Sequence, residues 1–176
     1  MARLVCNMPK GLKETSGLIT IGFAVEESAA NTFTQEKTDL QLNVLDREVF
    51  VVYGCVLDIS APDLVPGTNT NAYASVSTTS RTSVGNLSNA NVIATGANQI
   101  RSAGPGDGTP FTYSSADAPP TQLEYLGIIA TNDFYVQVVG QNNTSTKAVS
   151  GRIYGVRARA DADTFAALTQ SELLSA

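Results

Sequence analysis

Apolar and polar residues alternate along most of this chain, and a period of two residues is typical of β-strands that bury one face. Every second side chain from residue 19 to residue 25 is aliphatic or aromatic, and similar runs recur as far as residue 160. Turn-forming residues separate these runs. The pattern predicts about eight strands, at 19–25, 39–44, 48–59, 71–84, 91–100, 121–130, 134–138 and 152–160.

The run from Glu48 to Ile59 differs from the other predicted strands because both of its faces are apolar. Such a strand must be covered on both sides, by a facing sheet and by a loop, a helix or a neighbouring subunit. Gly54 in its middle predicts a β-bulge or a close approach of another backbone. The run before it has Leu40, Leu42 and Val44 at alternate positions, which predicts a half-buried strand.

Two segments between the strands are candidates for contact with partners. The turn at 61–71 contains Pro66 followed by glycine, which marks a chain reversal. The segment 102–120 is rich in glycine and proline and predicts a long irregular loop. Loops of this length are uncommon in compact domains and usually serve a function. Within it, Phe111 and Tyr113 could anchor the loop to the body of the protein or to a partner.

The last residues change character and predict a short helix at 163–174. Asp163 is placed to cap its N-terminus. Phe165, Leu168 and Leu173 are predicted to share one face. So short a helix is marginal in isolation, so we expect it to dock on the body of the protein or on a neighbouring molecule.

Length and composition indicate one domain, residues 1–176, that functions through contacts with protein. Charged residues make up 15% of the chain, below the usual value of about 25%. A surface with few charges suits contact areas, because few charges need to be desolvated there. The net charge is −5, and no cluster of Lys or Arg is visible. Direct binding to nucleic acid, which needs a basic patch, is therefore not expected.

The residues needed for most catalytic sites are missing, and we expect no catalytic, cofactor-binding or metal-binding site. The chain has no histidine, which removes the Ser-His-Asp and Cys-His arrangements and the commonest general base. Cys6 and Cys55 are too isolated for a zinc site. Cys55 is expected to be a buried small hydrophobe, and a disulfide between the two stays open. Carboxylates that could act as a catalytic pair, such as Asp58 and Asp63, stand where solvated acids usually stand.

The N-terminus lacks the apolar stretch of a signal peptide, and no run is long enough to span a membrane. We therefore expect the protein to be made in the cytosol and kept there until it assembles. Sugar binding is a rival interpretation, because β-sandwiches often bind sugars. Against it, the chain has no tryptophan, and its tyrosines fall mostly within predicted strands.

An all-β chain of about eight antiparallel strands, with long loops and a short C-terminal helix, suits a single jelly-roll β-sandwich or barrel. In this layout, across residues from about 17 to 160, the chain resembles the single jelly-roll capsid proteins of viruses. It is most similar in size and organisation to the smaller major capsid protein of sphaerolipovirus-like viruses, which are tailless, icosahedral double-stranded DNA viruses with an internal membrane.

That resemblance implies a virion shell subunit that pairs with itself or with a second, larger coat protein, near the viral membrane and without direct contact to nucleic acid. A capsid decoration (cement) or surface-fibre protein is the alternative, followed by a carbohydrate-binding sandwich or an unusual enzyme. The residues expected to make assembly contacts are Pro66, Phe111, Tyr113, Phe165, Leu168 and Leu173.

Overall fold

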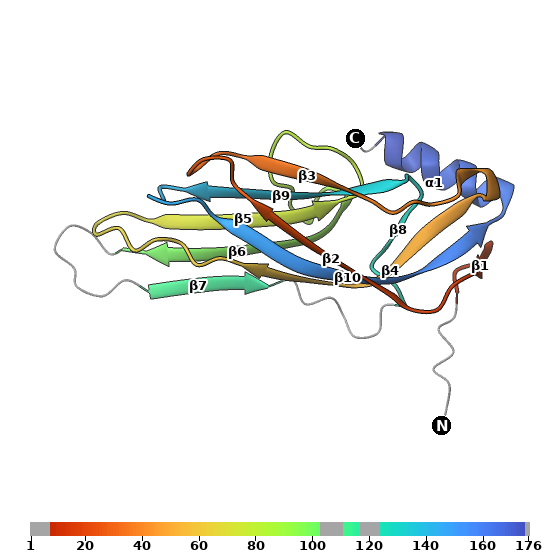
Figure 1. Cartoon of the computed structure of the whole chain (residues 1–176), viewed down its shortest axis with the longest axis horizontal. Coiled ribbons are helices and arrows are strands. Elements are labelled where there is room, and N and C mark those ends of the chain that lie inside the picture. Colours follow the sequence, from red (N-terminus) through yellow and green to blue (C-terminus); the bar gives the residue numbers. More distant parts are fainter. Residues whose placement is uncertain (1–7, 103–110, 117–123, 175–176) are drawn as a thin grey trace, which may run out of the picture.

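The computed structural model of the chain describes residues 8–102, 111–116 and 124–174. These residues form ten strands in two antiparallel sheets and one C-terminal helix, α1 (Ala162–Leu174) (Figure 1). The strands are β1 (Leu12–Glu14), β2 (Ile19–Glu26), β3 (Thr34–Asp39), β4 (Glu48–Ile59), β5 (Thr70–Ser77), β6 (Val92–Arg101), β7 (Phe111–Ala116), β8 (Gly127–Ile129), β9 (Asp133–Gln141) and β10 (Ala148–Ala160).

The order of the strands confirms the predicted all-β jelly roll. In sheet A, β2 and β1 pair with successive parts of β10, which is followed by β4 and β8. In sheet B the order is β3, β9, β5, β6 and β7. The chain crosses between the sheets at most connections, so strands distant in sequence become neighbours. This double-sheet arrangement of interleaved Greek keys defines a jelly roll.

The main core lies between the two sheets, where the inward side chains of both meet. Phe50 and Val52 of β4 face Phe134, Val136 and Val138 of β9, and all five are buried. The ring of Phe23 packs edge-on against that of Phe134, with ring centres 6.0 Å apart. The alternation of apolar residues therefore predicted the inward positions of these strands correctly.

The opposite face of β4 is apolar as well, and it forms a second core on the outside of sheet A. Val49 and Val51 are fully buried there beside Val156 and Ala158 of β10. Helix α1 helps to cover this cluster. The prediction that β4 must be covered on both sides is confirmed, and a helix of the same chain contributes to the second cover.

Glycine residues at the junction of β4 and β10 mark a bulge and a close approach. The register shifts at this point, because Tyr154 lies opposite Gly54 whereas Gly155 lies opposite Val52. The β-bulge predicted from Gly54 is thus confirmed. Gly155 cannot be replaced without adjustment, because a Cβ there would collide with the carbonyl oxygen of Val51 and the ring of Phe50.

The strand predicted at 39–44 is wrong, although two of its apolar residues are buried. The strand in this region, β3, ends at Asp39, and its six residues are polar. Leu40 and Leu42 are buried in a loop, where the backbone N–H of Leu40 donates to the carbonyl of Asn132 at 2.8 Å. A 3₁₀ turn, Val44–Asp46, then leads into β4, and Val44 is exposed. Alternate residues are therefore buried here without belonging to a β-strand.

Several other boundaries differ from the sequence pattern. The strand predicted at 71–84 ends at Ser77, and the one predicted at 121–130 is reduced to β8, with residues 121–123 outside the described residues. The predicted irregular loop 102–120 contains a strand, β7, which pairs with β6. The rest of that loop, apart from Ser102, also lies outside the described residues.

Candidate assembly surfaces

Helix α1 is fixed to sheet A at its first turn and along one face. Asp161 caps the helix, accepting a hydrogen bond from the backbone N–H of Thr164 at 2.8 Å. The prediction of Asp163 as the cap is wrong by two residues. The hydroxyl and the N–H of Thr164 hold the pKa of Asp161 below its usual range. Phe165 and Leu168 pack against the second core, so these two predicted contact residues dock the helix on its own subunit.

A buried carboxylate secures the other end of α1. Glu172 is only 8% exposed, and its two oxygens accept the N–H groups of Ala130 and Thr131 at 3.0 and 2.9 Å. Burial raises the pKa of Glu172 above its usual range and Asp133 adds to this, whereas the two backbone hydrogen bonds oppose it. The sequence contained a signal for this contact, because residues 165, 168 and 172 follow the spacing of one helical face.

The C-terminal part of α1 exposes two leucines beside small and polar residues. Leu173 is 67% exposed and Leu174 is 79% exposed, and both line a shallow hollow of about 510 Å³ together with Phe165 and Ala166. Helix α1 contains no Lys or Arg. Leu173, unlike Phe165 and Leu168, is therefore placed to contact another molecule.

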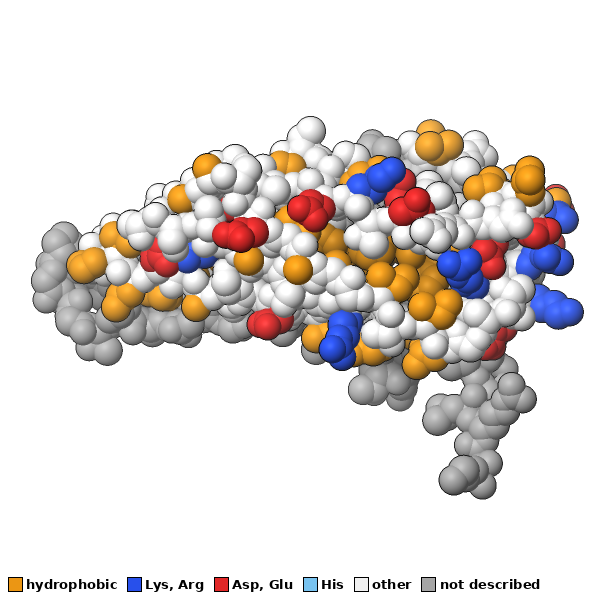
Figure 2. All heavy atoms as spheres, in the orientation of Figure 1, with side chains coloured by type: hydrophobic (Ala, Val, Ile, Leu, Met, Phe, Trp, Pro, Cys, Tyr) orange, Lys and Arg blue, Asp and Glu red, His pale blue; other side chains and the backbone are white. Residues whose placement is uncertain are grey.

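A second exposed apolar element lies at the same end of the sandwich. Leu45, in the 3₁₀ turn before β4, is 95% exposed. The turn lies beside the start of α1 (Figure 1), and the carbonyl of Arg47 accepts the N–H of Ala160 at 2.9 Å. Figure 2 shows hydrophobic side chains on the surface at this end of the molecule. This end therefore combines exposed apolar side chains from two separate segments.

The opposite end of the sandwich is held together by buried ionic and polar contacts. Lys147 contacts Asp63 at 2.6 Å, and its side chain is almost completely buried. The Lys147 ammonium, together with Ser145 and Thr144, holds the pKa of Asp63 well below its usual range. Glu27 is also buried and accepts the N–H groups of Gly140 and Lys147 at 2.6 and 2.7 Å. These contacts fix the loops at this end relative to one another.

Pro66 lies at this second end, in the turn after β4, and is exposed as a contact residue should be. In β7, Phe111 and Tyr113 take positions opposite Arg101 and Gln99 of β6, at the edge of sheet B. The six predicted contact residues therefore do not form one patch. They are divided between the α1 end, the edge of sheet B and the opposite end of the sandwich.

Polar residues are buried on the outer face of sheet B, under the loop 78–91. Gln137 is fully buried, and its amide nitrogen donates to the hydroxyl of Ser77 at 2.7 Å. Its amide oxygen accepts the hydroxyl of Ser75 at 2.7 Å, and that hydroxyl in turn accepts the N–H of Gly85 at 2.9 Å. The loop is thus tied to the sheet by a connected hydrogen-bond network. Sequence reasoning missed this network, because its members are far apart in the chain.

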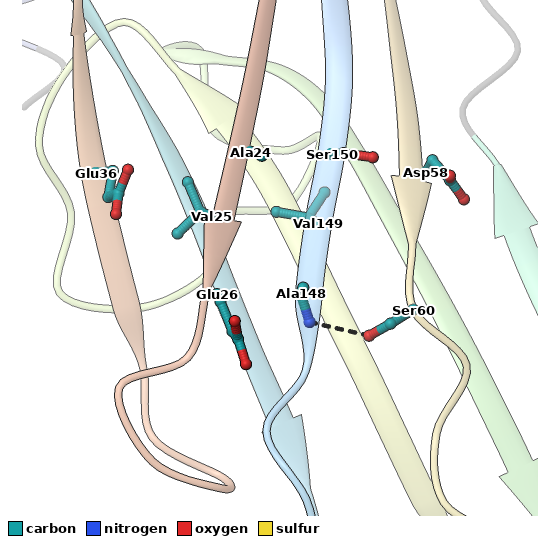
Figure 3. A pocket seen from close by; sticks show the side chains of 9 residues that line it. All are labelled: Ala24, Val25, Glu26, Glu36, Asp58, Ser60, Ala148, Val149 and Ser150. Atoms are coloured by element: carbon teal, nitrogen blue, oxygen red, sulfur yellow. Dashed lines mark hydrogen bonds between the residues drawn. The ribbon is translucent and has the colours of Figure 1, made fainter.

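An acidic hollow of about 500 Å³ crosses β2 and β10 between β3 and β4, near the ends of these strands (Figure 3). Glu26, Glu36 and Asp58 line it, and Figure 3 shows Asp58 pointing away from the two glutamates. No aromatic side chain contributes to its lining. Within the described part of the chain, no group of three or more His, Cys, Asp or Glu side chains is placed to hold a metal ion.

Most of the described tyrosines that could stack on a sugar ring are engaged within the fold. Tyr53 and Tyr125 pack against the second core. The hydroxyl of Tyr73 accepts a hydrogen bond from the amide of Gln99 at 3.4 Å. The tyrosine side chains therefore do not gather around the acidic hollow.

The chain matches no family model, no curated protein and no solved structure in comparisons with known proteins. In the described residues, no helix is both long enough and apolar enough to cross a membrane. What the chain does must therefore be inferred from its jelly-roll topology and from the chemistry of its surfaces.

Proposed function

We propose that this chain is a structural subunit of an icosahedral virus shell, which assembles into capsomers through protein–protein contacts. The observation that carries the proposal is a jelly roll whose exposed helix face has apolar side chains and no basic residue. The jelly roll is shared by viral capsid proteins, lectins and cupins. Inferring a capsid function from this fold alone is therefore an analogy. The chemistry of the surfaces is what distinguishes these classes of protein.

The surface chemistry favours assembly over the other functions of this fold. A cupin needs a metal site, usually built from histidine, and the sequence has none. A lectin commonly stacks a sugar on an aromatic ring, and the acidic hollow has none in its lining. Exposed leucines at the α1 end instead provide the kind of surface that is buried between subunits.

The resemblance to shell proteins also specifies partners and location. We propose that the chain associates with itself and with a second, larger coat protein, and that it resides in the virion after synthesis in the host cytoplasm. The low basic content supports a shell without direct contact to the genome, since binding to phosphates requires clustered Lys and Arg. An internal membrane beneath the shell fits this arrangement.

A decoration protein on the outside of a capsid is the second candidate, and the exposed apolar end of α1 supports it equally. The two functions differ in copy number and position. Electron microscopy of native particles would place a shell subunit within the continuous capsid layer, whereas a decoration protein would lie on top of a shell built from another chain.

The proposed function is tested by comparing two leucines of equal exposure. Leu173 on α1 and Leu18 before β2 are both 67% exposed. We expect Leu173→Ser to reduce assembly of the purified chain, measured by mass photometry and negative-stain microscopy, whereas Leu18→Ser should leave assembly closer to wild type. Equal assembly of both variants would count against a contact through α1, and failure of the wild-type chain to associate at all would count against the shell function.

A further inference from the structure

A small pocket lies where α1 meets the body of the protein, and we call it the helix pocket. It has a volume of about 120 Å³, and its lining includes Thr78, Asn91, Ile128, Leu168 and Glu172. The pocket adjoins both the edge strand β8 and the end of the loop 78–91. Its lining therefore combines aliphatic side chains with hydroxyl, amide and carboxylate groups.

Glu172 brings a charge into this pocket that no basic side chain balances among the residues the structure describes. Its oxygens accept two backbone N–H groups, from Ala130 and Thr131. The charge of Asp133, which is also negative, raises the pKa of Glu172 further, and Asp133 is itself paired with Lys37 at 3.4 Å. Buried carboxylates are ordinarily compensated by a cation, because desolvation is costly for an isolated charge.

Thr78 adds a buried hydroxyl that has no hydrogen-bond partner among the described residues. Its side chain is only 7% exposed. Leaving a buried hydroxyl unsatisfied is unfavourable, and native structures rarely do so. A pocket that holds both a carboxylate and an unsatisfied hydroxyl is therefore suited to a ligand that donates hydrogen bonds and carries positive charge.

We infer that the helix pocket receives the side-chain ammonium of a lysine from a second copy of this chain, an inference that rests on the proposed shell function. The four-carbon stem of lysine would lie against Ile128 and Leu168, and its ammonium would donate to the Glu172 carboxylate. Lysine combines an apolar stem with a compact charged end, which matches this mixed lining.

The sequence restricts which lysine can do this. Of the four lysines, Lys37 pairs with Asp133 and Lys147 pairs with Asp63. Lys10 and Lys13 are exposed, and neither forms an ion pair within the described residues. The donor is therefore Lys10 or Lys13, at the start of the sandwich.

The topology places Lys13 on the far side of sheet A from the pocket of its own subunit. Lys13 lies in β1, whereas Glu172 contacts the residues that follow β8, and β1 and β8 are the opposite ends of the order β1-β10-β4-β8. Three strand spacings separate these strands, about 14 Å. The contact is therefore between different surfaces of two copies. A heterologous contact of this kind produces rings when the rotation closes, which is the geometry of a capsomer.

The first experiment tests the pocket without requiring assembly. Thermal unfolding of the full chain at dilute concentration is measured in n-butylammonium chloride, a lysine side-chain analogue, and in NaCl of equal ionic strength, with n-butanol as the uncharged control. We expect only butylammonium to raise Tm. Glu172→Gln should weaken this binding roughly tenfold or more, because a charge-assisted hydrogen bond is lost. Equal responses to butylammonium and NaCl would overturn the inference.

A second variant tests the pocket without removing the Glu172 carboxylate that helps to dock α1. Thr78→Val keeps the carboxylate and the shape of the side chain but removes the unsatisfied hydroxyl. It should fold as the wild type does and bind butylammonium several-fold more weakly. If Thr78→Val and wild type bind butylammonium equally, the hydroxyl is not part of the site and the inference fails in its present form.

The second experiment identifies the source of the ammonium. ¹⁵N-labelled and unlabelled protein are mixed, allowed to assemble and treated with a carbodiimide, which links a carboxylate directly to an adjacent amine. We expect cross-linked peptides of mixed isotope content that join Glu172 to Lys10 or Lys13, and their loss in Lys10→Gln/Lys13→Gln. Butylammonium binding without mixed cross-links in assembled material would overturn the second copy as occupant. Absence of assembly would instead contradict the proposed function.

Discussion

The two sheets of this jelly roll bury part of their outer faces by different chemistry. On sheet A, Val49 and Val51 lie in an apolar cluster to which Phe165 of α1 contributes. On sheet B, Gln137 and Ser75 are equally buried, but hydrogen bonds connect them to the loop 78–91. We call α1 on sheet A the apolar cover and the loop 78–91 on sheet B the polar cover. The apolar cover tolerates small shifts of the helix, whereas the polar cover requires every donor and acceptor to stay in place.

The difference predicts that the polar cover is the more sensitive to single substitutions. Gln137→Ala removes the partner of Ser75, Ser77 and Gln35 at once. Since each unsatisfied buried group costs about 1–3 kcal/mol, we expect a loss of roughly 3 kcal/mol or more in the free energy of unfolding. Urea denaturation measures it. The control Gln99→Ala, on the half-exposed outer face of β6, should change stability by less than about 1 kcal/mol. Similar losses for the two variants would contradict a connected network.

The apolar cover should respond less strongly. Phe165→Ala removes a half-buried ring from the second core, and we expect a loss of about 2 kcal/mol, below the 3–5 kcal/mol typical of a fully buried phenylalanine. Leu174→Ala, on the exposed side of the same helix, serves as the matched control and should stay within about 0.5 kcal/mol of wild type. A loss for Phe165→Ala as small as that of the control would show that α1 does not cover sheet A.

A substitution in the loop 78–91 tests the polar cover from its other side. At Gly85, an added Cβ would collide with a methyl group of Val92 and come within 3.2 Å of Nε of Arg81. We expect Gly85→Ala to cost about 1 kcal/mol, at the low end for overpacking, because the half-exposed Val92 side chain can move. Hydrogen exchange at the Gly85 amide, which donates to Ser75, should accelerate relative to wild type. Unchanged exchange would mean that the loop keeps its hydrogen bonds despite the added methyl group.

Two carboxylates extend the comparison to charge, because their pKa values move in opposite directions. Burial raises the pKa of Glu172, so its contribution to stability is greatest below its unfolded value of about 4.3 and is lost as the pH rises through the folded pKa. The Lys147 ammonium lowers the pKa of Asp63, so its contribution is present above about 3.9 and is lost as the pH falls through the folded pKa.

The corresponding measurement is the difference in unfolding free energy between wild type and each neutral variant, as a function of pH. Relative to Glu172→Gln, the wild type should gain stability as the pH falls from 7 toward 4.5. Relative to Asp63→Asn, it should lose stability only as the pH falls below about 4. The same sign for both carboxylates would contradict the distinction between a carboxylate with a cation and one without.

The two covers also differ in how well the sequence predicts them. The doubly apolar run at Glu48–Ile59 predicted the second core and its need for a cover, because the pattern within one segment contains that information. The polar cover on sheet B had no such signal. Gln137 and Ser75 look like solvent-facing residues in their own strands, and only the folded topology brings the loop over them.

Smaller errors have the same origin. β3 was missed because an edge strand can be polar throughout, and the neighbouring alternation of Leu40 and Leu42 drew the prediction to a loop instead. In α1, the prediction placed Leu173 on the buried face because it is apolar. The structure buries Glu172 instead, which agrees with the helical spacing of residues 165, 168 and 172. Backbone N–H groups after β8, which the sequence could not place, donate hydrogen bonds to that buried carboxylate.

The central claim is that this jelly roll functions by associating with copies of itself or with a sister coat protein. Analytical ultracentrifugation of the purified full chain over a wide concentration range, alone and with a candidate for the larger coat protein proposed as its partner, tests it most directly. We predict closed rings or larger particles whose formation depends on Leu173. A strictly monomeric species at the highest concentration, with no binding to the coat protein, would contradict the claim.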